Sequence, residues 1–169
     1  MRAISLWQPW ASAIAVNAKR VETRGWPTSY RGPLAIHAAQ RLVKSELLHY
    51  ASCWNWCGAL APMGWAMRME AKPWDLLPFG AVVATCTVVD CRPSESFTEE
   101  EIDTPRRPEG QHADLWNWTE REMGDFGPGR YGWTLDEVRR LPTPIPYRGA
   151  QGFFQVPYEM IAAAFREPA

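Results

Sequence analysis

The sequence lacks long apolar runs, internal repeats and low-complexity linkers. It contains no stretch of about 18 consecutive apolar residues, so we expect no helix that crosses a membrane. The opening residues reach polar Gln8 and Pro9 before the apolar segment of a signal peptide can form. Because 169 residues is the length of one domain, we predict a single domain over residues 1–169.

Cysteine and histidine are also scarce. The chain has 4 cysteines and no expected secretion signal, which indicates reduced thiols and a cytoplasmic location. His49, Cys53 and Cys57 fall at helical spacing and could begin a zinc site. Cys86 and Cys91 point to opposite faces of a predicted strand and do not complete such a site. We therefore expect buried free thiols, no metal and no cofactor.

Neither sign of charge is in excess. A net charge of −1 argues against a protein that coats duplex nucleic acid. The charges are unevenly distributed, however: residues 1–50 hold 7 basic and 2 acidic side chains, and the remainder holds 11 and 17. One basic region on a nearly neutral protein favours a local anionic ligand.

Tryptophan, in contrast, is abundant, with 10 residues. Ten large amphipathic rings are difficult to bury completely, so we expect a subset to line a groove. Trp10 and the amide of Gln8 stand at the start of a predicted helix, where they could stack on a base and read its edge. The alternative is that Trp7 and Trp10 belong to the core, and for Trp7 this interpretation is favoured.

The hydrophobic pattern predicts more strand than helix. Strands are expected at 3–7, 20–25, 32–38, 79–91, 131–141 and 151–156, and helices at 10–17, 41–57, 113–123 and 158–166. Residues 58–78 are predicted to be an aromatic-rich loop, and 92–125 a solvated insertion or a lid that limits access to single strands. We predict an α+β fold, a mainly antiparallel β-barrel with peripheral helices.

The stretch NAKRVETRGW, residues 17–26, concentrates charge between apolar flanks. On a strand, Glu22 and Arg24 point to one face about 7 Å apart, and Lys19 arrives from the preceding turn. Lysine and arginine could hold a phosphate, and the carboxylate could accept a proton from an exocyclic amine of a base. The alternative is a surface cluster of ion pairs, each contributing under about 1 kcal/mol.

Further candidates lie after this stretch. Trp26, Tyr30 and Arg31 could hold a phosphate or a stacked base, or the two rings could close one end of the barrel. His37, at the end of a buried strand, is either a hydrogen-bonded core histidine or a general acid–base group. If the last strand lies beside the first, Gln151 could face the same groove as Gln8.

Three segments together resemble the ASCH domain family: SLWQPWA, NAKRVETR and YRGPLAIHA. The family signature G-x-K-x-x-E-x-R is matched by Asn17, Lys19, Glu22 and Arg24, with asparagine in place of glycine. Asparagine tolerates a positive φ, so we expect the turn to keep its shape. The resemblance extends to FGAVVATCTVVDC and to the C-terminal segment from Tyr131, and omits 58–78 and 92–125.

This resemblance implies a PUA-like β-barrel and a monomer whose basic groove binds single-stranded RNA or a modified nucleoside or nucleotide. Some branches of the family are hydrolases, one acting on N4-acetylcytidine and another on single-stranded RNA. The amidohydrolase branch uses a lysine, a threonine three residues later and a distant glutamate. Here Lys19 matches, Glu22 stands at the threonine position and Thr23 is adjacent. Binding is therefore the main expectation, with hydrolysis through Lys19 and Glu22 as the alternative.

Overall fold

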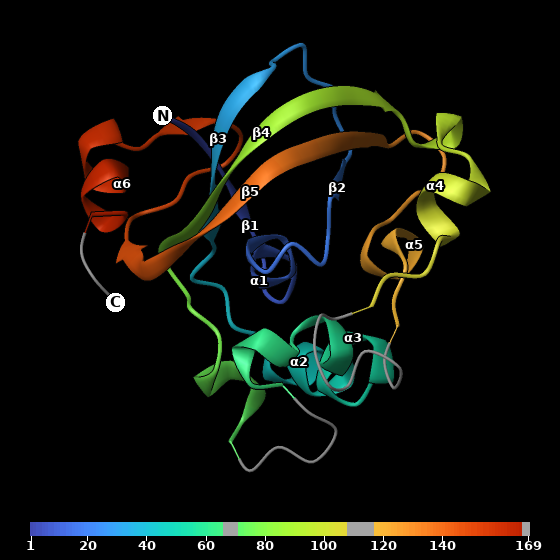
Figure 1. The fold of residues 1–169 in the computed structure, drawn as a ribbon, viewed down its shortest axis with the longest axis horizontal. Helices are drawn as coiled ribbons and strands as arrows, with labels where there is room; N and C mark the ends of the chain where they lie inside the picture. Colours follow the sequence, from blue (N-terminus) through green and yellow to red (C-terminus); the bar gives the residue numbers. More distant parts are fainter. Residues whose placement is uncertain (66–70, 108–116, 167–169) are drawn as a thin grey trace.

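The computed structural model describes residues 1–65, 71–107 and 117–166, and shows a curled sheet with helices on both sides (Figure 1). The strands are β1 (Arg2–Leu6), β2 (Val21–Arg24), β3 (Gly32–Ala38), β4 (Ala81–Pro93), β5 (Tyr131–Pro146) and β6 (Phe154–Gln155). The helices are α1 (Trp10–Ala15), α2 (Lys44–Ala51), α3 (Trp54–Ala59), α4 (Glu99–Asp103), α5 (Glu120–Met123) and α6 (Tyr158–Ala164).

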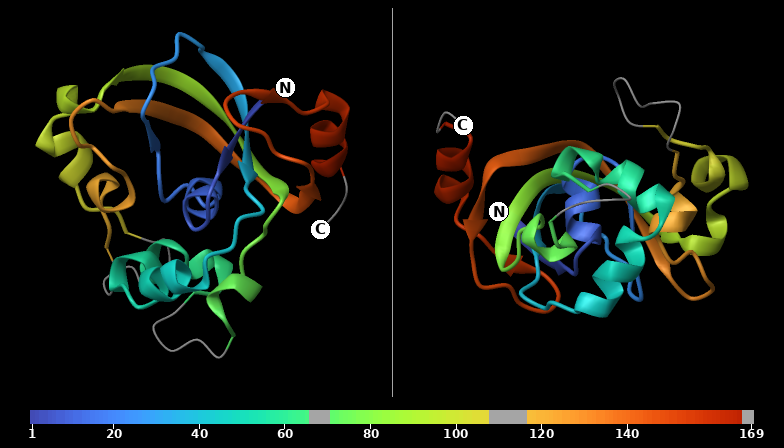
Figure 2. Two further views of the ribbon diagram at one scale, coloured as in Figure 1. Left: turned by 180° about the vertical axis from the view of Figure 1, so that it is seen from behind. Right: turned by 90° about the horizontal axis from the view of Figure 1, so that it is seen from below.

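The six strands form one mixed sheet in the order β2-β5-β4-β3-β1-β6. Only the β1–β3 pair is parallel, so the predicted α+β class and mainly antiparallel sheet are confirmed. The predicted β-barrel is not confirmed, because the sheet is curled but open, with β2 and β6 as its two edges. Helix α1 fills the space inside the curl instead, as the view from below shows (Figure 2).

The curl comes from the two longest strands. Strand β4 is rich in β-branched residues, which favour extended backbone. Its pairing with β5 shifts register at three places, between Val82 and Ala84, between Thr85 and Thr87, and between Val88 and Asp90. Such bulges bend a strand and increase its twist, so the sheet wraps around α1 rather than lying flat.

Helix α1 is built of small residues because it is enclosed. Five of its six residues, Ala11 to Ala15, are buried. A helix that is apolar on every side must be covered all round, and alanine side chains let strand backbones approach closely. Ile14 fills the main core with Leu34, Ile36 and Trp133. A second core joins α1 to α2 and α3, and a third packs α6 against the sheet.

Several predicted elements differ from the structure at their ends. The predicted helix 41–57 is two helices, α2 and α3, which are separated at Ser52 and Cys53. The described part of the predicted helix 113–123 holds only α5, since 113–116 lie outside the described residues. Strand β6 is only two residues long but does pair with β1, as expected for the last strand. No helix within the described ranges is long and apolar enough to cross a membrane.

Candidate functional site

The signature stretch begins at a tight turn after α1. Asn17 has φ 59°, the left-handed conformation that its match to the family's glycine predicted. The backbone amides of Ala18 and Lys19 both donate to the carbonyl of Ala13, which ends the helix and turns the chain back toward the sheet. This turn directs Lys19 into the protein, where only 1% of the residue is exposed.

Lys19, Glu22 and Arg24 converge as the strand alternation predicted. Lys19 Nζ lies 3.6 Å from Glu22 Oε2, and Arg24 Nη1 lies 3.5 Å from Glu22 Oε1. Lys19 Nζ also donates to the carbonyl of Val21 at 2.5 Å. Glu22 is 6% exposed, so its carboxylate is held between two cations away from bulk water. These ion pairs are buried, so they do not form the solvated surface cluster that the sequence left open as an alternative.

These three residues line a pocket of about 470 Å³, a size typical of small-molecule sites. The described residues that line it include three basic side chains (Lys19, Arg24, Arg130) and three carboxylates (Glu22, Glu122, Asp125). The pocket is therefore of mixed charge, whereas the sequence predicted a basic groove. A ligand in it meets hydrogen-bond donors and acceptors at fixed positions rather than a uniform positive field.

Aromatic rings form another part of the pocket wall. Trp10, Tyr50 and Trp56 all line it. Trp10 meets Tyr50 edge to face at 5.2 Å and Trp56 at 6.0 Å between ring centroids. Tyr50 and Trp56 are 5.0 Å apart, so the three rings hold one another in place. Burial is the main cause that raises the pKa of the Tyr50 hydroxyl, which keeps it a neutral donor.

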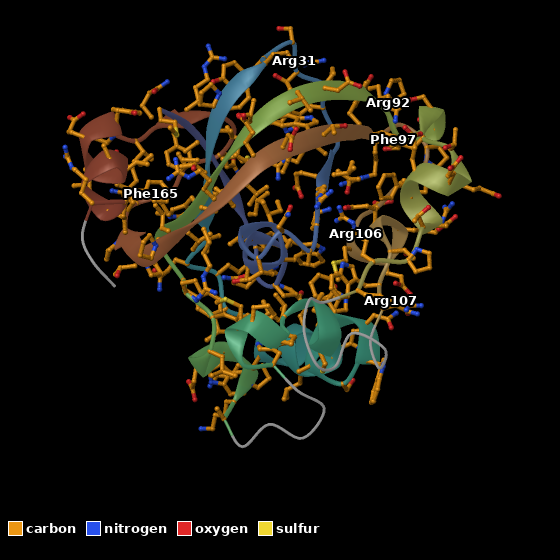
Figure 3. The ribbon with its side chains drawn as sticks, in the orientation of Figure 1. Arg31, Arg92, Phe97, Arg106, Arg107 and Phe165 are labelled. Carbon is orange, nitrogen blue, oxygen red and sulfur yellow. The ribbon has the colours of Figure 1, made fainter. Side chains whose placement is uncertain are left out.

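Two residues of the polar segment 92–125, Arg106 and Glu120, pack on the signature stretch. Glu120 accepts hydrogen bonds from the backbone amides of Arg20 at 2.7 Å and Val21 at 3.2 Å. Arg106 pairs with Glu120 at 2.7 Å and donates to the carbonyl of Ala18 at 2.8 Å. Figure 3 shows Arg106 beside α5, on the side that faces β2. Arg106 and Glu120 therefore pack on the signature stretch, whereas Glu99, Glu100 and Arg107 of the same segment are exposed.

Thr23 is held by the same part of the chain. Its hydroxyl oxygen accepts a hydrogen bond from the backbone amide of Asp125 at 2.9 Å, and its carbonyl accepts from Arg130 at 3.1 Å. Arg130 also pairs with the Asp125 carboxylate at 3.2 Å. The pocket thus has one wall from β2 and another from the segment that follows α5.

Gln8 is occupied by contacts within the chain. Its amide nitrogen donates to the carbonyl of Pro78 at 2.7 Å, and its oxygen accepts from the backbone amide of Ser12 at 3.1 Å. It is 3% exposed and does not line the pocket. Trp7 was expected in the core but is 51% exposed, and the Arg41 guanidinium stacks on its ring 3.6 Å from the centroid.

Trp26 and Tyr30 belong to an aromatic cluster at one end of the sheet. Trp26 lies 4.6 Å from Trp133 and 5.5 Å from Phe153, and Tyr30 lies 5.6 Å from Phe153. Arg31 pairs with Asp90 at 3.1 Å and lies at the tip of the loop before β3, remote from α1 (Figure 3). None of the three lines the pocket, and the rings pack against the core.

His37 and Gln151 line a second pocket, of about 720 Å³. His37 Nε2 lies 2.9 Å from the carbonyl of Tyr147, and Nδ1 lies 3.0 Å from Ser5 Oγ. A carbonyl can only accept, so Nε2 carries the proton and Nδ1 accepts from Ser5. Burial lowers the pKa of His37, which favours this neutral form.

The three residues considered for zinc do not form a ligand cluster. The helix ends at Ser52, so His49, Cys53 and Cys57 do not share one helical face. The thiols of Cys53 and Cys57 each donate to a backbone carbonyl instead. In residues 1–65, 71–107 and 117–166, no group of three or more histidine, cysteine, aspartate or glutamate side chains could hold a metal ion.

Several residues of the pocket were not predicted from the sequence. Tyr50 and Trp56 come from α2 and α3, within the predicted helix 41–57, and neither was a predicted site residue. Glu122 and Asp125 lie at the end of the segment 92–125, and Arg130 follows it, and none of the three was expected to reach the signature stretch. The one local signal was the pattern at Thr119, where a threonine followed by Glu122 forms a capping box that starts α5.

Comparison with known proteins agrees with the signature. A family model described as the ASCH domain matches residues 4–126. A comparison with curated protein sequences gives no significant match. The matched range includes α1, the turn at Asn17, the Lys19–Glu22–Arg24 group and β4, which is most of the framework described above. The chain therefore belongs to the ASCH domain family.

Proposed function

We propose that this protein binds a nucleotide or single-stranded RNA, with one base in the pocket beside Glu22. ASCH domains are generally thought to bind RNA or nucleotides. The single observation that carries the proposal is the position of Glu22. Its buried carboxylate lies between Lys19 and Arg24, in a pocket whose wall also holds Trp10, Tyr50 and Trp56.

This arrangement matches the chemistry of a base. Aromatic side chains stack on a base and contribute about 1–3 kcal/mol each. A carboxylate accepts a hydrogen bond from the exocyclic amine of cytosine, which uracil lacks. The two cations hold the Glu22 carboxylate in one orientation, and Arg24, at the pocket surface, is available to an anionic group of the ligand.

Arg24 gives the direct test of binding. The probe is a fluorescein-labelled hexacytidylate RNA, followed by anisotropy in buffers of low and moderate salt. We expect Arg24→Ala to weaken binding about tenfold at low salt, and wild-type affinity to fall as salt rises. Arg166→Ala, an exposed arginine outside the described pockets, is the matched control and should bind like the wild type. Equal affinity of Arg24→Ala and wild type at low salt, with both folded, would refute the site.

Glu22 gives the test of base recognition. Wild-type protein should prefer cytidine 5′-monophosphate to uridine 5′-monophosphate, and Glu22→Gln should remove most of this preference. The amide of glutamine keeps the size of the side chain but replaces one acceptor by a donor. An unchanged ratio of the two dissociation constants would show that Glu22 does not contact the base.

Hydrolysis is the second candidate, favoured by Lys19. Its amine is enclosed beside a carboxylate, and the hydroxyl of Thr23 lies in the same pocket. Removal of an acyl group from N4-acetylcytidine, or cleavage of labelled single-stranded RNA, tests it directly. Turnover that is lost in Lys19→Met, with the fold intact, would support a hydrolase. If no product forms after long incubation at high protein concentration, hydrolysis is rejected and binding is the function that remains.

A further inference from the structure

The pocket beside Glu22 and the second pocket adjoin each other. Ser5 and Trp7 line both. Their volumes are about 470 and 720 Å³, and each is large enough for a small-molecule ligand by itself. A ligand bound in the first pocket can therefore extend past Trp7 into the second pocket.

Trp7 is an exposed ring that is nevertheless held in place. Half of its surface is accessible, and the Arg41 guanidinium lies 3.6 Å from its ring centroid. Arg41 is in turn paired with Glu46 at 3.2 Å. Exposed aromatic rings on a fixed support are what proteins use to stack successive bases of a single strand.

The two pockets differ in charge. Three carboxylates and three cations line the first pocket, so it has no net positive charge to attract a phosphate group. Among the described residues that line the second pocket, none is a carboxylate, and Arg148 is positively charged. Across the parts of the chain that the structure describes, no ion pair engages the exposed Arg148 guanidinium. Gln40 and Gln151 add amide groups that can bind base edges.

The second pocket also has a rigid floor. Gly149 lies so close to the Ser5–His37 pair that a Cβ there would collide with Ser5 Oγ and the imidazole ring. His37 in turn bonds the carbonyl of Tyr147. Tyr147 and Gly149 are thus held against β1 and β3, and Arg148 and Gln151 line the same pocket as Trp7.

We infer that the ligand is an oligonucleotide of at least two nucleotides, which spans both pockets with its linking phosphate near Arg148 and a base against Trp7. This inference rests on the proposed function and adds the second pocket to it. One base occupies the pocket beside Glu22. The phosphate that follows is directed away from the three carboxylates, and the next nucleotide enters the pocket of Arg148, Gln40 and Gln151.

The test compares cytidine, cytidine 5′-monophosphate and the dinucleotide CpC in an NMR titration. Signals of the Trp10 indole report the first pocket, and those of the Gln151 side-chain amide report the second. We expect cytidine to shift Trp10 alone and CpC to shift both. CpC should bind about tenfold more tightly than the mononucleotide, as one further stacked base implies. In Arg148→Ala, the ratio of the affinity for CpC to that for the mononucleotide should fall to near one. In Arg166→Ala, this ratio should be that of the wild type.

Each outcome has a distinct meaning. If the mononucleotide binds as tightly as CpC, or CpC leaves Gln151 unshifted, the two-pocket inference is refuted while the binding site beside Glu22 stands. If none of the three probes shifts Trp10, the proposed function itself fails. If Arg148→Ala retains the full advantage of CpC, the second pocket does not hold the dinucleotide.

Discussion

Glu120 Oε1 accepts a hydrogen bond at 2.7 Å from the backbone amide of Arg20, a residue 100 positions earlier in the chain. The other carboxylate oxygen accepts from Val21, and Arg106 pairs with the same group. A side chain from α5 thus holds the backbone of the signature stretch, so that Lys19 and Glu22, on either side of it, keep their places in the pocket.

Replacing Glu120 should destabilise the protein strongly. Glu120→Ala leaves two backbone amides and the partly buried Arg106 without their acceptor, a loss on the order of 3 kcal/mol in the free energy of unfolding. Urea denaturation measures it. Glu159→Ala, on the exposed side of α6, is the control and should cost under about 0.5 kcal/mol. A similar small effect for Glu120→Ala would show that its hydrogen bonds are replaced by water.

Lys19 and Glu22 should be energetically coupled. A double-mutant cycle with Lys19→Met and Glu22→Gln is expected to give an interaction free energy of about 1–2 kcal/mol, because both side chains are buried and only 3.6 Å apart. The same cycle on the half-exposed pair Arg41–Glu46 should give a smaller value. Additive effects of the two buried substitutions would mean that Arg24 alone neutralises Glu22.

His37 should make the protein less stable in mild acid. Burial lowers the pKa of His37 in the folded state, although its hydrogen bond to Tyr147 partly opposes this. As the pH falls through the ordinary histidine pKa of about 6.5, the unfolded chain takes up a proton that the folded chain does not. The free energy of unfolding therefore declines from this pH down to the lowered pKa of the folded state.

Urea denaturation between pH 7.5 and 5 measures this effect. We expect His37→Gln to reduce the decline, since the variant has no group there to titrate. His49→Gln, at an exposed position on α2, is the matched control, and its free energy of unfolding should decline with pH as that of the wild type does. Parallel curves for wild type and His37→Gln would show that other groups cause the decline.

Cys86 should resist alkylation in the native protein. Burial raises the pKa of its thiol to about 12, so almost no thiolate forms at pH 8. Cys53 and Cys91 are only partly buried and should react first with iodoacetamide. Mass spectrometry of the modified peptides measures the order, and urea should make all four thiols reactive. Alkylation of native Cys86 at the rate of Cys53 would contradict the packing of β4 against β3.

The sequence alone determined the features that depend on neighbouring residues. The β-branched run predicted β4, and the bounds of β3 are those expected. The turn at Asn17 and the convergence of Lys19, Glu22 and Arg24 also followed from local pattern. These features occupy a few consecutive positions, where backbone geometry fixes the direction of each side chain.

Only the tertiary structure decided how the sheet ends and what completes the pocket. The sheet stays open, with β2 and β6 as its edges, and its curl depends on bulges in the β4–β5 pairing that no alternation pattern marks. The wall formed by Tyr50 and Asp125, and the anchoring of β2 by Glu120, join residues distant in sequence. Such contacts form only when the whole chain is folded, because their partners share no local period by which the sequence could pair them.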